Sequence, residues 1–376
     1  MPPIMLVVKV WKMIGMRNEK LSQILNYDLV IIGAGPAGTT AARVASEKGI
    51  RTLIIEKKAC IGSPVQCAEH IPKLLMQQVN FNSRCITQEV GMMITYMPGG
   101  DVVETKAPGY IIDRSLFDKG LALDAISNGA DLMIKTIALS RNKTGLIART
   151  GNKEICIEAK VIIGADGPNS TVGGWINRKN KEFVSAAQCE VLLNKPIEAT
   201  CIYFCMEYMG GYGWLFPKGR TANVGVGINN KIGRIKLSTC LKHLLDRLQK
   251  EEKIKDKSAV AYTAGLIPVG GYLDTSPHEN ILIIGDAAGQ TDPITGAGIS
   301  QAISCGKIAG EVVAKAIQEK DLTLLGEYEK RWKGLFQRSL DNAHQKRKLL
   351  DNHWKDDQLD QILRKTWVGF DGYWRK

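Results

Sequence analysis

The sequence lacks several features that would assign it to a class at once. No stretch of its 376 residues approaches the roughly 20 consecutive apolar residues of a membrane-spanning helix. The nine cysteines include no Cys-x-x-Cys pair, which favours free thiols in a reducing compartment over a disulfide framework or a metal site. Internal repeats and low-complexity linkers are also missing. These absences predict a cytoplasmic globular protein without a bound metal.

The N-terminal residues 1–26 contain little that would serve as a targeting signal. Lys9 and Lys12 interrupt their one apolar stretch, and no small-residue cleavage site follows it. We therefore expect a loose N-terminal extension, or a chain whose true start is Met16. A short segment that touches a membrane is the alternative.

Acidic residues are too few to balance the basic ones, 38 against 50, so the formal net charge is +12. Half of this excess lies in Lys330–Lys376, which contains 12 Lys and Arg but 6 Asp and Glu. A basic surface attracts polyanions in general. Because no nucleic-acid-binding module is recognisable, we expect no nucleic acid and favour anionic lipid or a diphosphate. A solvated basic surface that aids solubility is the alternative.

The first part of the chain alternates between apolar and helical segments. Tyr27–Ile32 and Arg51–Lys57 have the composition of buried strands, and a glycine-rich turn and a helix separate them. This order predicts parallel strands joined by a right-handed crossover. Ser115–Asn128 has the pattern of a helix, with Ser115 as its expected N-cap.

The middle of the chain has the pattern of an antiparallel sheet. Met92–Thr105 alternates in polarity around a Pro-Gly-Gly-Asp turn and predicts a hairpin, and Phe183–Ile228 contains strand-like segments with glycine turns. An amphipathic helix is expected over Lys236–Lys250. Asn280–Gly289 then returns to a buried parallel strand, and a helix is expected after it up to about Ile317.

One complete dinucleotide-binding pattern is present, Gly33-x-Gly35-x-x-Gly38, with Glu56 at the end of the next strand. Gly33 permits the tight turn, Gly35 lets a pyrophosphate approach the backbone, and Gly38 lets helix and strand pack closely. The helix N-terminus then faces the phosphate charge, and Glu56 can accept hydrogen bonds from a ribose. The pattern follows a strand and opens a helix, which is the context that its function requires.

Two later strand ends carry further glycine-rich turns. One contains Asp166 in Gly-Ala-Asp-Gly-Pro, and the other contains Asp286, with Gly296 and Gly298 before a helix. Each alone fits a purely structural strand-to-turn junction equally well. Together they predict a ligand that extends beyond an ADP half, because a strand-end Asp can bind ribityl hydroxyls and a helix N-terminus can face the anionic edge of a reduced flavin. The expected cofactor is FAD.

In order and spacing, the three motifs resemble those of the FAD-dependent para-hydroxybenzoate hydroxylase superfamily. Three further features resemble the geranylgeranyl reductase family: Gly62-x-Pro64-x-x-Cys67, Asp113-Arg114-x-x-Phe117-Asp118 and Tyr212-x-Trp214-x-Phe216-Pro217. The resemblance implies a FAD-dependent oxidoreductase acting on CH–CH groups. Such an enzyme saturates the C=C bonds of a prenyl diphosphate or an isoprenoid lipid by hydride transfer from reduced flavin.

The resemblance also implies roles for single residues. Those expected to bind FAD are Gly33, Gly35, Gly38, Glu56, Arg114, Asp166, Asp286, Gly296 and Gly298. Cys67 would lie close to the flavin as the candidate catalytic residue, and a buried packing role is its alternative. Tyr212, Trp214 and Phe216 would line the prenyl channel. They share one face if their segment is a strand, and ordinary core packing is their alternative.

These motifs predict an α/β fold with an α+β substrate lobe. A Rossmann-type FAD-binding domain would comprise residues 27–85, 110–178 and 276–325. The inserted antiparallel-sheet substrate domain would comprise residues 86–109 and 179–275, and a helical C-terminal segment residues 326–376.

Two other functions are compatible with this fold: a FAD-dependent aromatic monooxygenase, and an electron-transfer flavoprotein without alkene turnover. Ala68-Glu69-His70 follows Cys67 where the resemblance leads us to expect more glycine, so the substrate is less defined than the cofactor. The sequence contains no second Gly-x-Gly-x-x-Gly site for a nicotinamide. NAD(P)H and ferredoxin are therefore both candidate reductants.

The C-terminal segment combines its positive charge with seven aromatic residues: Trp332, Phe336, Trp354, Trp367, Phe370, Tyr373 and Trp374. Aromatic rings suit the bilayer interface, and basic residues are attracted to anionic lipid. One interpretation is peripheral contact with the inner face of the membrane. The other is that these aromatic residues cover the FAD domain.

Overall fold

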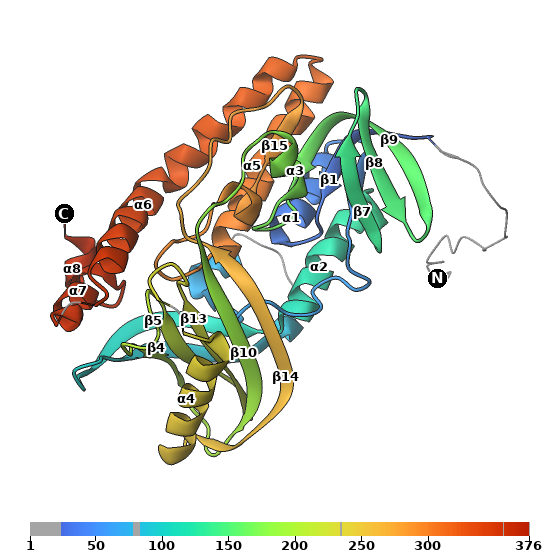
Figure 1. Cartoon of the computed structure of the whole chain (residues 1–376). Coiled ribbons are helices and arrows are strands. Elements are labelled where there is room, and N and C mark those ends of the chain that lie inside the picture. The colour runs from blue at the N-terminus through green and yellow to red at the C-terminus, as the bar shows by residue number, and fades with distance from the viewer. Residues whose placement is uncertain (1–23, 78–82, 234, 356, 376) are drawn as a thin grey trace.

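The fold is described from a computed structural model of the chain, which describes residues 24–77, 83–233, 235–355 and 357–375. The chain is organised around two β-sheets with helices packed against them (Figure 1). Most of the expected extension, residues 1–26, lies outside the described residues. Within these ranges, no helix combines the length and the apolar character needed to cross a membrane.

The first sheet has seven strands, and its central strands are buried. Its parallel strands are β6 (Asp131–Met133), β2 (Thr52–Ile55), β1 (Ile24–Ile32), β9 (Lys153–Gly164) and β15 (Ile281–Ile283). The remaining two strands, β7 (Thr136–Arg141) and β8 (Gly145–Thr150), form an antiparallel hairpin beside β9. The predicted parallel strands around the first glycine motif are therefore confirmed.

Three helices cover one face of this sheet: α1 (Pro36–Glu47), α2 (Arg114–Ser127) and α5 (Ile299–Gln318). α1 and α5 pack closely through two glycines of α5. A Cβ atom at Gly306 would come 2.4 Å from the carbonyl oxygen of Ala37, and one at Gly310 would come 2.6 Å from that of Ala41. The opposite face of the sheet packs against α3 (Thr171–Trp175) and the β7–β8 hairpin.

The start of α2 corrects one sequence-based prediction. The N-cap is Asp113 and not Ser115, because the Asp113 carboxylate accepts a hydrogen bond from the backbone N–H of Leu116. Asp and Ser are both favoured at this position, so the sequence offered two equivalent choices two residues apart.

The second sheet has eight strands and is largely antiparallel. In spatial order they are β14 (Ile254–Pro268), β10 (Phe183–Leu193), β13 (Thr221–Ile228), β12 (Tyr212–Lys218), β11 (Ala199–Tyr203), β4 (Ile86–Tyr96), β5 (Val102–Ile112) and β3 (His70–Pro72). The predicted hairpin is confirmed as β4 and β5. The predicted amphipathic helix, α4 (Leu237–Lys250), buries its leucines against one face of this sheet.

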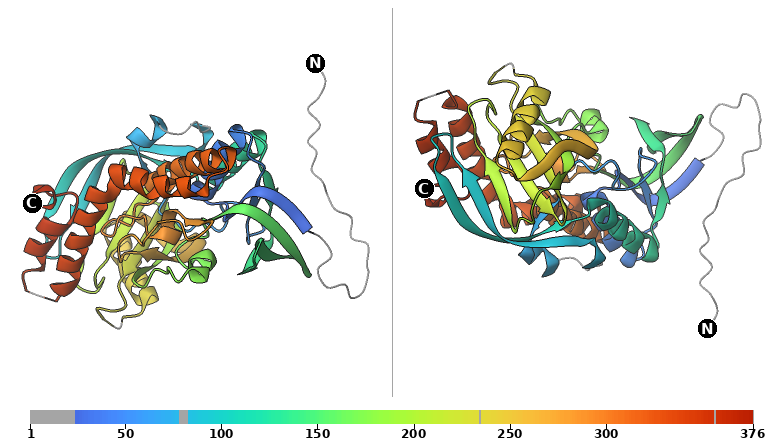
Figure 2. Two further views of the ribbon diagram at one scale, coloured as in Figure 1. Left: turned by 90° about the horizontal axis from the view of Figure 1, so that it is seen from above. Right: turned by 90° about the horizontal axis from the view of Figure 1, so that it is seen from below.

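The C-terminal helices connect the two sheets. α6 (Glu327–Asn352) packs Tyr328 and Trp332 into the core of the first sheet. Its end, together with α7 (Leu359–Thr366) and α8 (Asp371–Trp374), packs on the face of the second sheet opposite α4. Figure 2 shows α6 extending along the molecule to that end.

This packing decides between the two interpretations of the C-terminal aromatic residues. Most are buried or partly buried and face the protein interior: Trp332, Phe336, Trp354, Trp367, Phe370 and Tyr373. Trp374 alone among the seven is strongly exposed, at 71%. The expectation that the aromatic set faces a bilayer was therefore wrong, because the helices use these rings as packing surface. The rings cover both sheets and not the FAD domain alone.

The two sheets divide the chain close to the predicted domain boundaries. β3 is an exception, since it joins the second sheet although the boundaries assigned residues 27–85 to the FAD-binding domain. Four short 3₁₀ helices complete the described elements: Lys73–Gln77, Ser83–Cys85, Gly285–Ala288 and Leu322–Gly326. The division into functional domains itself stays a prediction.

Candidate functional site

The first glycine motif forms the turn between β1 and α1. Gly33 has φ +104°, and a Cβ atom there would come 2.3 Å from the carbonyl oxygen of Ala165. A Cβ at Gly38 would come 2.1 Å from the carbonyl oxygen of Gly33. Both contacts require glycine: the first lets the turn approach the second motif, and the second lets α1 pack against the turn itself. A Cβ at Gly35 would meet no atom within 4 Å, so this glycine borders open space at the N-terminus of α1.

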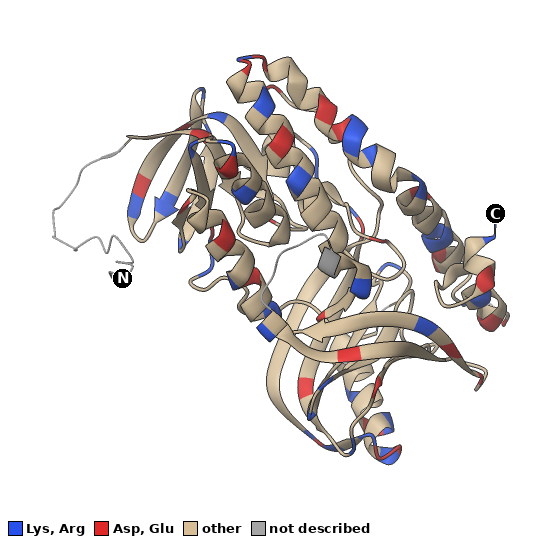
Figure 3. Ribbon diagram, turned by 180° about the vertical axis from the view of Figure 1, so that it is seen from behind, with Lys and Arg blue, Asp and Glu red and all other residues tan. Residues whose placement is uncertain are grey.

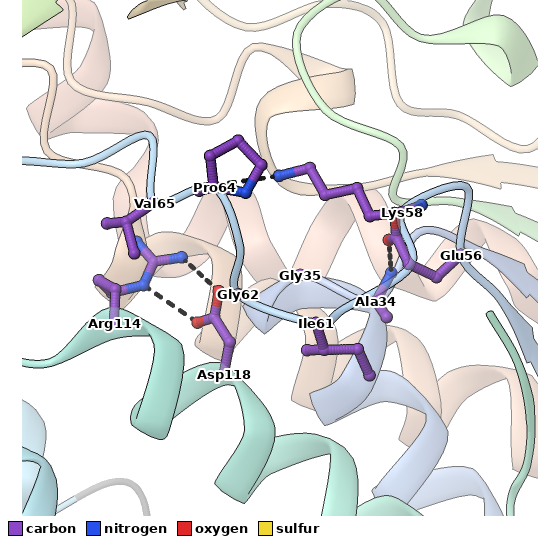
Figure 4. Close-up of a pocket in the computed structure, with 10 residues that line it drawn as sticks. All are labelled: Ala34, Gly35, Glu56, Lys58, Ile61, Gly62, Pro64, Val65, Arg114 and Asp118. Atoms are coloured by element: carbon purple, nitrogen blue, oxygen red, sulfur yellow. Dashed lines mark hydrogen bonds and ion pairs between the residues drawn. The ribbon is translucent and has the colours of Figure 1, made fainter. Parts of the chain in front are cut away.

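The open space beside Gly35 is a pocket that three segments of the chain enclose (Figure 4). Glu56 lies on one side, where its two carboxylate oxygens accept 2.8 Å hydrogen bonds from the backbone N–H groups of Ala34 and Lys58. Arg114 lies on the opposite side. A helix N-terminus and a guanidinium around one pocket favour an anionic ligand such as a pyrophosphate.

Arg114 forms a two-pronged ion pair with Asp118 one turn further along α2. Its Nε and Nη2 atoms lie 3.0 Å and 2.9 Å from the two carboxylate oxygens. Burial lowers the pKa of Arg114, but the Asp118 carboxylate and the nearby Cys67 thiol raise it by more. The guanidinium therefore stays a cation beside the pocket.

The third motif places a buried carboxylate near the same arginine. Oδ1 of Asp286 accepts a 2.7 Å hydrogen bond from the hydroxyl of Thr291, and a Cβ at Gly298 would come 3.2 Å from that oxygen. Burial raises the pKa of Asp286, while Thr291 and the positive charge of Arg114 act to lower it. Gly298 is the N-cap of α5, and Gly296 lies in the turn before it with φ +70°.

The second motif is joined to the third by one amide side chain. Nδ2 of Asn180 donates to the carbonyl oxygens of Pro168 and Asp286, at 3.0 Å and 2.8 Å. Asp166 itself accepts a 2.6 Å hydrogen bond from the hydroxyl of Ser170 and further bonds from the first N–H groups of α3. Its carboxylate thus has a local role at that helix, and contact with a cofactor stays a prediction for it.

Cys67 lies in the segment that leads from the pocket to β3. Its carbonyl oxygen accepts a 2.7 Å hydrogen bond from Nε2 of Gln188, and its sulfur accepts one of 3.2 Å from the backbone N–H of Glu69. The side chain is half-buried and interacts with Arg114. The structure therefore places the candidate catalytic thiol and the predicted cofactor-binding arginine together, although 46 residues separate them by number.

The predicted channel residues share one face of β12. The Tyr212 and Trp214 rings lie 6.0 Å apart, and Phe216 lies 5.8 Å from His70, both in edge-to-face contact. The Tyr212 hydroxyl donates a 2.6 Å hydrogen bond to the carbonyl oxygen of Thr295. Since Thr295 precedes Gly296 in the third motif, this bond joins the aromatic face directly to the predicted flavin turn.

Sequence reasoning missed the other wall of this aromatic region. Trp367, directly after α7, packs edge-to-face on Tyr212 at 5.0 Å and on Phe204 at 5.1 Å. A small pocket lies between them, lined also by Arg347, Leu350 and Thr366 among other residues. No local pattern indicated the two ring contacts of Trp367, because each joins residues more than 140 positions apart in the chain.

Among the described residues that line this small pocket, Arg347 alone is charged. It is 3% exposed, and its Nε donates a 3.0 Å hydrogen bond to Asp351 one turn along α6. Burial lowers the pKa of Arg347, and it raises the pKa of Asp351 despite the opposite charge beside it. The pair therefore anchors α6 against the aromatic region, although removing both charges from water costs free energy.

Comparison with known families divides the chain near the start of β10. A profile of the Thi4 family matches residues 11–195, and a profile described as the geranylgeranyl reductase catalytic domain matches residues 183–267. A Methanocaldococcus jannaschii protein named digeranylgeranylglycerophospholipid reductase is 36% identical over 92% of this chain and 92% of its own length. A Methanosphaera stadtmanae protein named digeranylgeranylglycerophospholipid reductase 3 is 39% identical over 78% of this chain and 79% of its own.

Solved structures with the same fold include a geranylgeranyl bacteriochlorophyll reductase-like protein from Thermoplasma acidophilum. Its TM-score is 0.82 at 29% identity, over 93% of this chain and 92% of that one. A ternary complex of aklavinone-11 hydroxylase with FAD and aklavinone has a TM-score of 0.68 at 16% identity, over 84% of this chain and 68% of that one. The latter likeness shows the fold alone.

Proposed function

The chain belongs to the geranylgeranyl reductase family, and on this premise we propose that its substrate is a glycerophospholipid with geranylgeranyl chains. The protein is a FAD-dependent oxidoreductase that saturates C=C bonds of a prenyl chain. The proposal for the particular lipid is supported by relatives that are named digeranylgeranylglycerophospholipid reductases and match this chain at 36% and 39% identity.

One observation about the geometry supports this function above the alternatives. The aromatic face of β12 is tied to the third glycine motif by the hydrogen bond from Tyr212 to Thr295. An isolated alkene offers no polar group for recognition, so a site that reduces it needs an apolar wall that excludes water beside the redox centre. Tyr212, Trp214 and Trp367 provide such a wall.

The residues of the cofactor half are suited to FAD. The open space in front of Gly35 would admit a pyrophosphate, Glu56 is positioned at the end of β2 for a ribose, and Arg114 supplies a permanent positive charge. Bound FAD, once reduced, supplies a hydride to one carbon of the alkene. We propose that Cys67, beside Arg114, lies close enough to this site to influence protonation of the other carbon.

Mass spectrometry of the lipid tests the proposal. The FAD-loaded protein is reduced with dithionite and incubated without oxygen with a glycerophospholipid that carries two geranylgeranyl chains. We expect stepwise gains of two hydrogens for each double bond that is saturated. Oxygen consumption with an aromatic substrate and no gain of hydrogen would favour a monooxygenase, and flavin reduction without any product would favour an electron carrier.

The same assay identifies the reductant. We propose that either NAD(P)H or a ferredoxin reduces the flavin in the cell, since the sequence contains no second dinucleotide pattern. NADPH, NADH and reduced ferredoxin each replace dithionite in parallel reactions. The donor that supports lipid saturation at the highest rate is the physiological class, and failure of all three would exclude both.

We further propose weak peripheral contact with the inner face of an anionic membrane, through basic side chains and not through the aromatic set. Exposed basic residues of the C-terminal segment include Lys330, Arg338, Lys348, Lys355, Lys365 and Arg375. Figure 3 shows acidic residues interspersed among the basic ones along α6, so the attraction is modest. Lipid substrates with long prenyl chains reside in membranes, which gives such contact a use.

Co-sedimentation with vesicles tests this contact. We expect binding to anionic vesicles at low salt, release at high salt, and a loss of binding of about 30-fold in the Arg338→Ser/Lys348→Ser variant, at about 1 kcal/mol for each of the two basic residues. The matched control is Lys195→Ser/Lys250→Ser, two exposed lysines away from the C-terminal helices. Equal binding by both variants, or by wild type to neutral vesicles, would contradict the proposal.

A further inference from the structure

Glu69 is a buried carboxylate that neither the glycine motifs nor the aromatic face accounts for. It is 1% exposed and has φ +70°, a conformation that non-glycine residues rarely adopt. Oε1 accepts a 2.8 Å hydrogen bond from the backbone N–H of Arg114. Oε2 accepts hydrogen bonds of 2.6 Å from Nζ of Lys218 and 2.7 Å from Nδ2 of Asn223. One side chain thus connects the first turn of α2 to β12 and β13.

The three residues from Cys67 to Glu69 are fixed by groups from three strands of the second sheet. Gln188 on β10 donates to the carbonyl oxygen of Cys67 at 2.7 Å, and Asn223 on β13 donates to that of Ala68 at 3.4 Å. The carbonyl oxygen of Glu69 accepts a 2.9 Å hydrogen bond from the backbone N–H of Ile112. The segment that carries the candidate catalytic thiol therefore has few free backbone groups.

The aromatic motif takes part in the same network. Nε1 of Trp214 donates a 3.2 Å hydrogen bond to Oε1 of Gln188, whose amide nitrogen binds the Cys67 carbonyl oxygen. Lys218 lies at the end of the strand that carries Trp214 and directly follows the Phe-Pro pair of the motif. β12, the strand that forms the apolar wall, is thus linked to the Cys67 segment twice: from Trp214 through Gln188, and directly from Lys218 at its end.

The charges of the network argue for a role in geometry. Lys218 is 16% exposed in its side chain and lies 3.7 Å from Glu190 in addition to its contact with Glu69. Burial acts to lower the pKa of Lys218, but Glu69 raises it above its ordinary value. Buried ion pairs contribute little net stability compared with well-packed apolar groups. A buried pair at a backbone conformation that is unfavourable for Glu is better explained by the positions it fixes.

We propose that Glu69 is a positioning residue, which sets the Cys67 thiol and the Arg114 end of α2 at a fixed place against the Trp214 strand. The inference deepens the proposed function, because it concerns the same site and takes Cys67 to lie beside the reacting alkene. It gives a use to a glutamate in Ala68-Glu69-His70, a segment where the family resemblance leads us to expect more glycine. The carboxylate serves three donors at once, and glycine could serve none.

Alkylation of Cys67 tests the proposal without measuring turnover. The FAD-loaded protein is treated with iodoacetamide, and the labelling rate of Cys67 is compared by peptide mass spectrometry with that of exposed Cys60 in the same chain. In Glu69→Gln an amide donor would face the Lys218 ammonium and the Asn223 amide. The Cys67 segment should loosen and its labelling ratio should rise by about tenfold, as expected for the loss of hydrogen bonds to a charged group.

Glu89→Gln is the matched control, because Glu89 pairs with Lys73 at 2.5 Å but both side chains are more than half exposed. Its labelling ratio should equal that of the wild type. If Glu69→Gln does not fold, Lys218→Met takes its place. That variant removes the ion pair and keeps the bond to the Arg114 N–H, so a smaller rise of several-fold is expected. A ratio in either folded variant that equals the wild-type ratio overturns the proposal.

A second measurement separates positioning from general stability. With the lipid substrate, Glu69→Gln should lower kcat by about tenfold and change KM by less than about twofold, because substrate binding rests on the aromatic face. A rise in KM at constant kcat would overturn the proposal. If the wild-type protein saturates no prenyl lipid, the proposed function fails, but the labelling ratio still shows whether Glu69 fixes Cys67.

Discussion

The two halves of the candidate site are built in different ways. In the cofactor half, contacts between backbone atoms of nearby motifs decide which residues can be present: Gly33 and Gly38 each leave no room for a Cβ atom. In the proposed lipid half, Phe204 after β11, Tyr212 on β12 and Trp367 after α7 meet only after the chain has folded. The first kind of region leaves a short pattern at each of its motifs, whereas the second leaves one only on β12 and none for the residues that pack against it.

The most disruptive test of this comparison is Gly35→Val. A side chain there would enter the open space at the N-terminus of α1, and it would meet no protein atom on the way. We expect a folded protein with at least about 100-fold weaker FAD binding, because the backbone could no longer approach the pyrophosphate. Flavin absorbance after gel filtration, followed by titration with FAD, measures this loss.

Gly91→Val is the control for this prediction, because a Cβ at Gly91 on β4 also meets nothing within 4 Å. It should retain the yellow colour. An equal loss of FAD from both variants would show that the effect is one of strand or helix propensity and not of access to the pocket.

The opposite change, loss of a side chain in the proposed lipid half, should leave FAD binding intact but should abolish turnover. Trp214→Ala and Trp367→Ala should each retain FAD and lose turnover of the prenyl lipid. Each should lower the free energy of unfolding by about 3–5 kcal/mol, as for other buried Trp→Ala changes. Flavin content, thermal unfolding and lipid mass spectrometry measure the three effects.

Trp374→Ala, which changes an exposed tryptophan, is the matched control and should alter none of these quantities. The result for Trp367 is the more informative one. If only Trp214→Ala abolished turnover, α7 and Trp367 would contribute to packing outside the site, and the lipid half would be confined to the β12 motif.

His70 lies where the two halves meet and should add a pH dependence to stability. Burial lowers its pKa from 6.5 to about 4. The unfolded chain therefore binds more protons than the folded one between these values. The stabilisation is complete above pH 6.5 and is lost as the pH falls through 4. The free energy of unfolding should fall by about 2 kcal/mol, a value reduced because the ring is only partly buried.

His70→Phe should remove this part of the slope, and the ring could keep its contact with Phe216. Urea unfolding at a series of pH values from neutral to 4 measures the slope. His243→Gln, at an exposed histidine of α4, serves as the control and should leave the slope unchanged. Identical slopes in wild type and His70→Phe would contradict the prediction.

The smallest expected effect distinguishes the hydrogen bond of Trp214 from the packing of its ring. Trp214→Phe keeps an aromatic ring on the apolar face but removes the N–H that donates to Gln188. A lost hydrogen bond of about 1 kcal/mol predicts an approximately fivefold fall in kcat, with FAD binding unchanged. Trp374→Phe removes an indole N–H that donates to Val368 on the surface, and it should have no effect.

The sequence predicted the parts of the fold whose determinants are local. β1, α1 and β2 lie where the glycine motif required them, and the leucine spacing of Leu237–Lys250 gave α4 correctly. The boundary of α2 was wrong because Asp113 and Ser115 are both good N-caps. Whether a segment forms a strand or a helix depends largely on neighbours within a few residues, and a single sequence contains that information.

The proposed lipid half depends on contacts between distant residues, which a single sequence does not reveal. Trp367 belongs to a segment whose basic and aromatic composition fitted a membrane surface as well as a core. Only the position of β12 decides that its ring packs on Tyr212. Glu69 lies in a segment with less glycine than expected, but its partners Lys218 and Asn223 lie about 150 positions away. Contacts at such separations leave no periodicity to detect.

The close packing of α1 on α5 has a consequence for motion. The first and third glycine motifs lie at the N-terminal ends of these two helices, and Gly306 and Gly310 allow their backbones to touch. The neighbouring atoms are backbone and the β-branched side chains of Thr40 and Val44, which absorb little shift, so the two turns proposed to face the cofactor should separate only if a whole helix moves. The amide hydrogens of α1 and α5 should therefore exchange with solvent as one cooperative unit, at the rate of global opening.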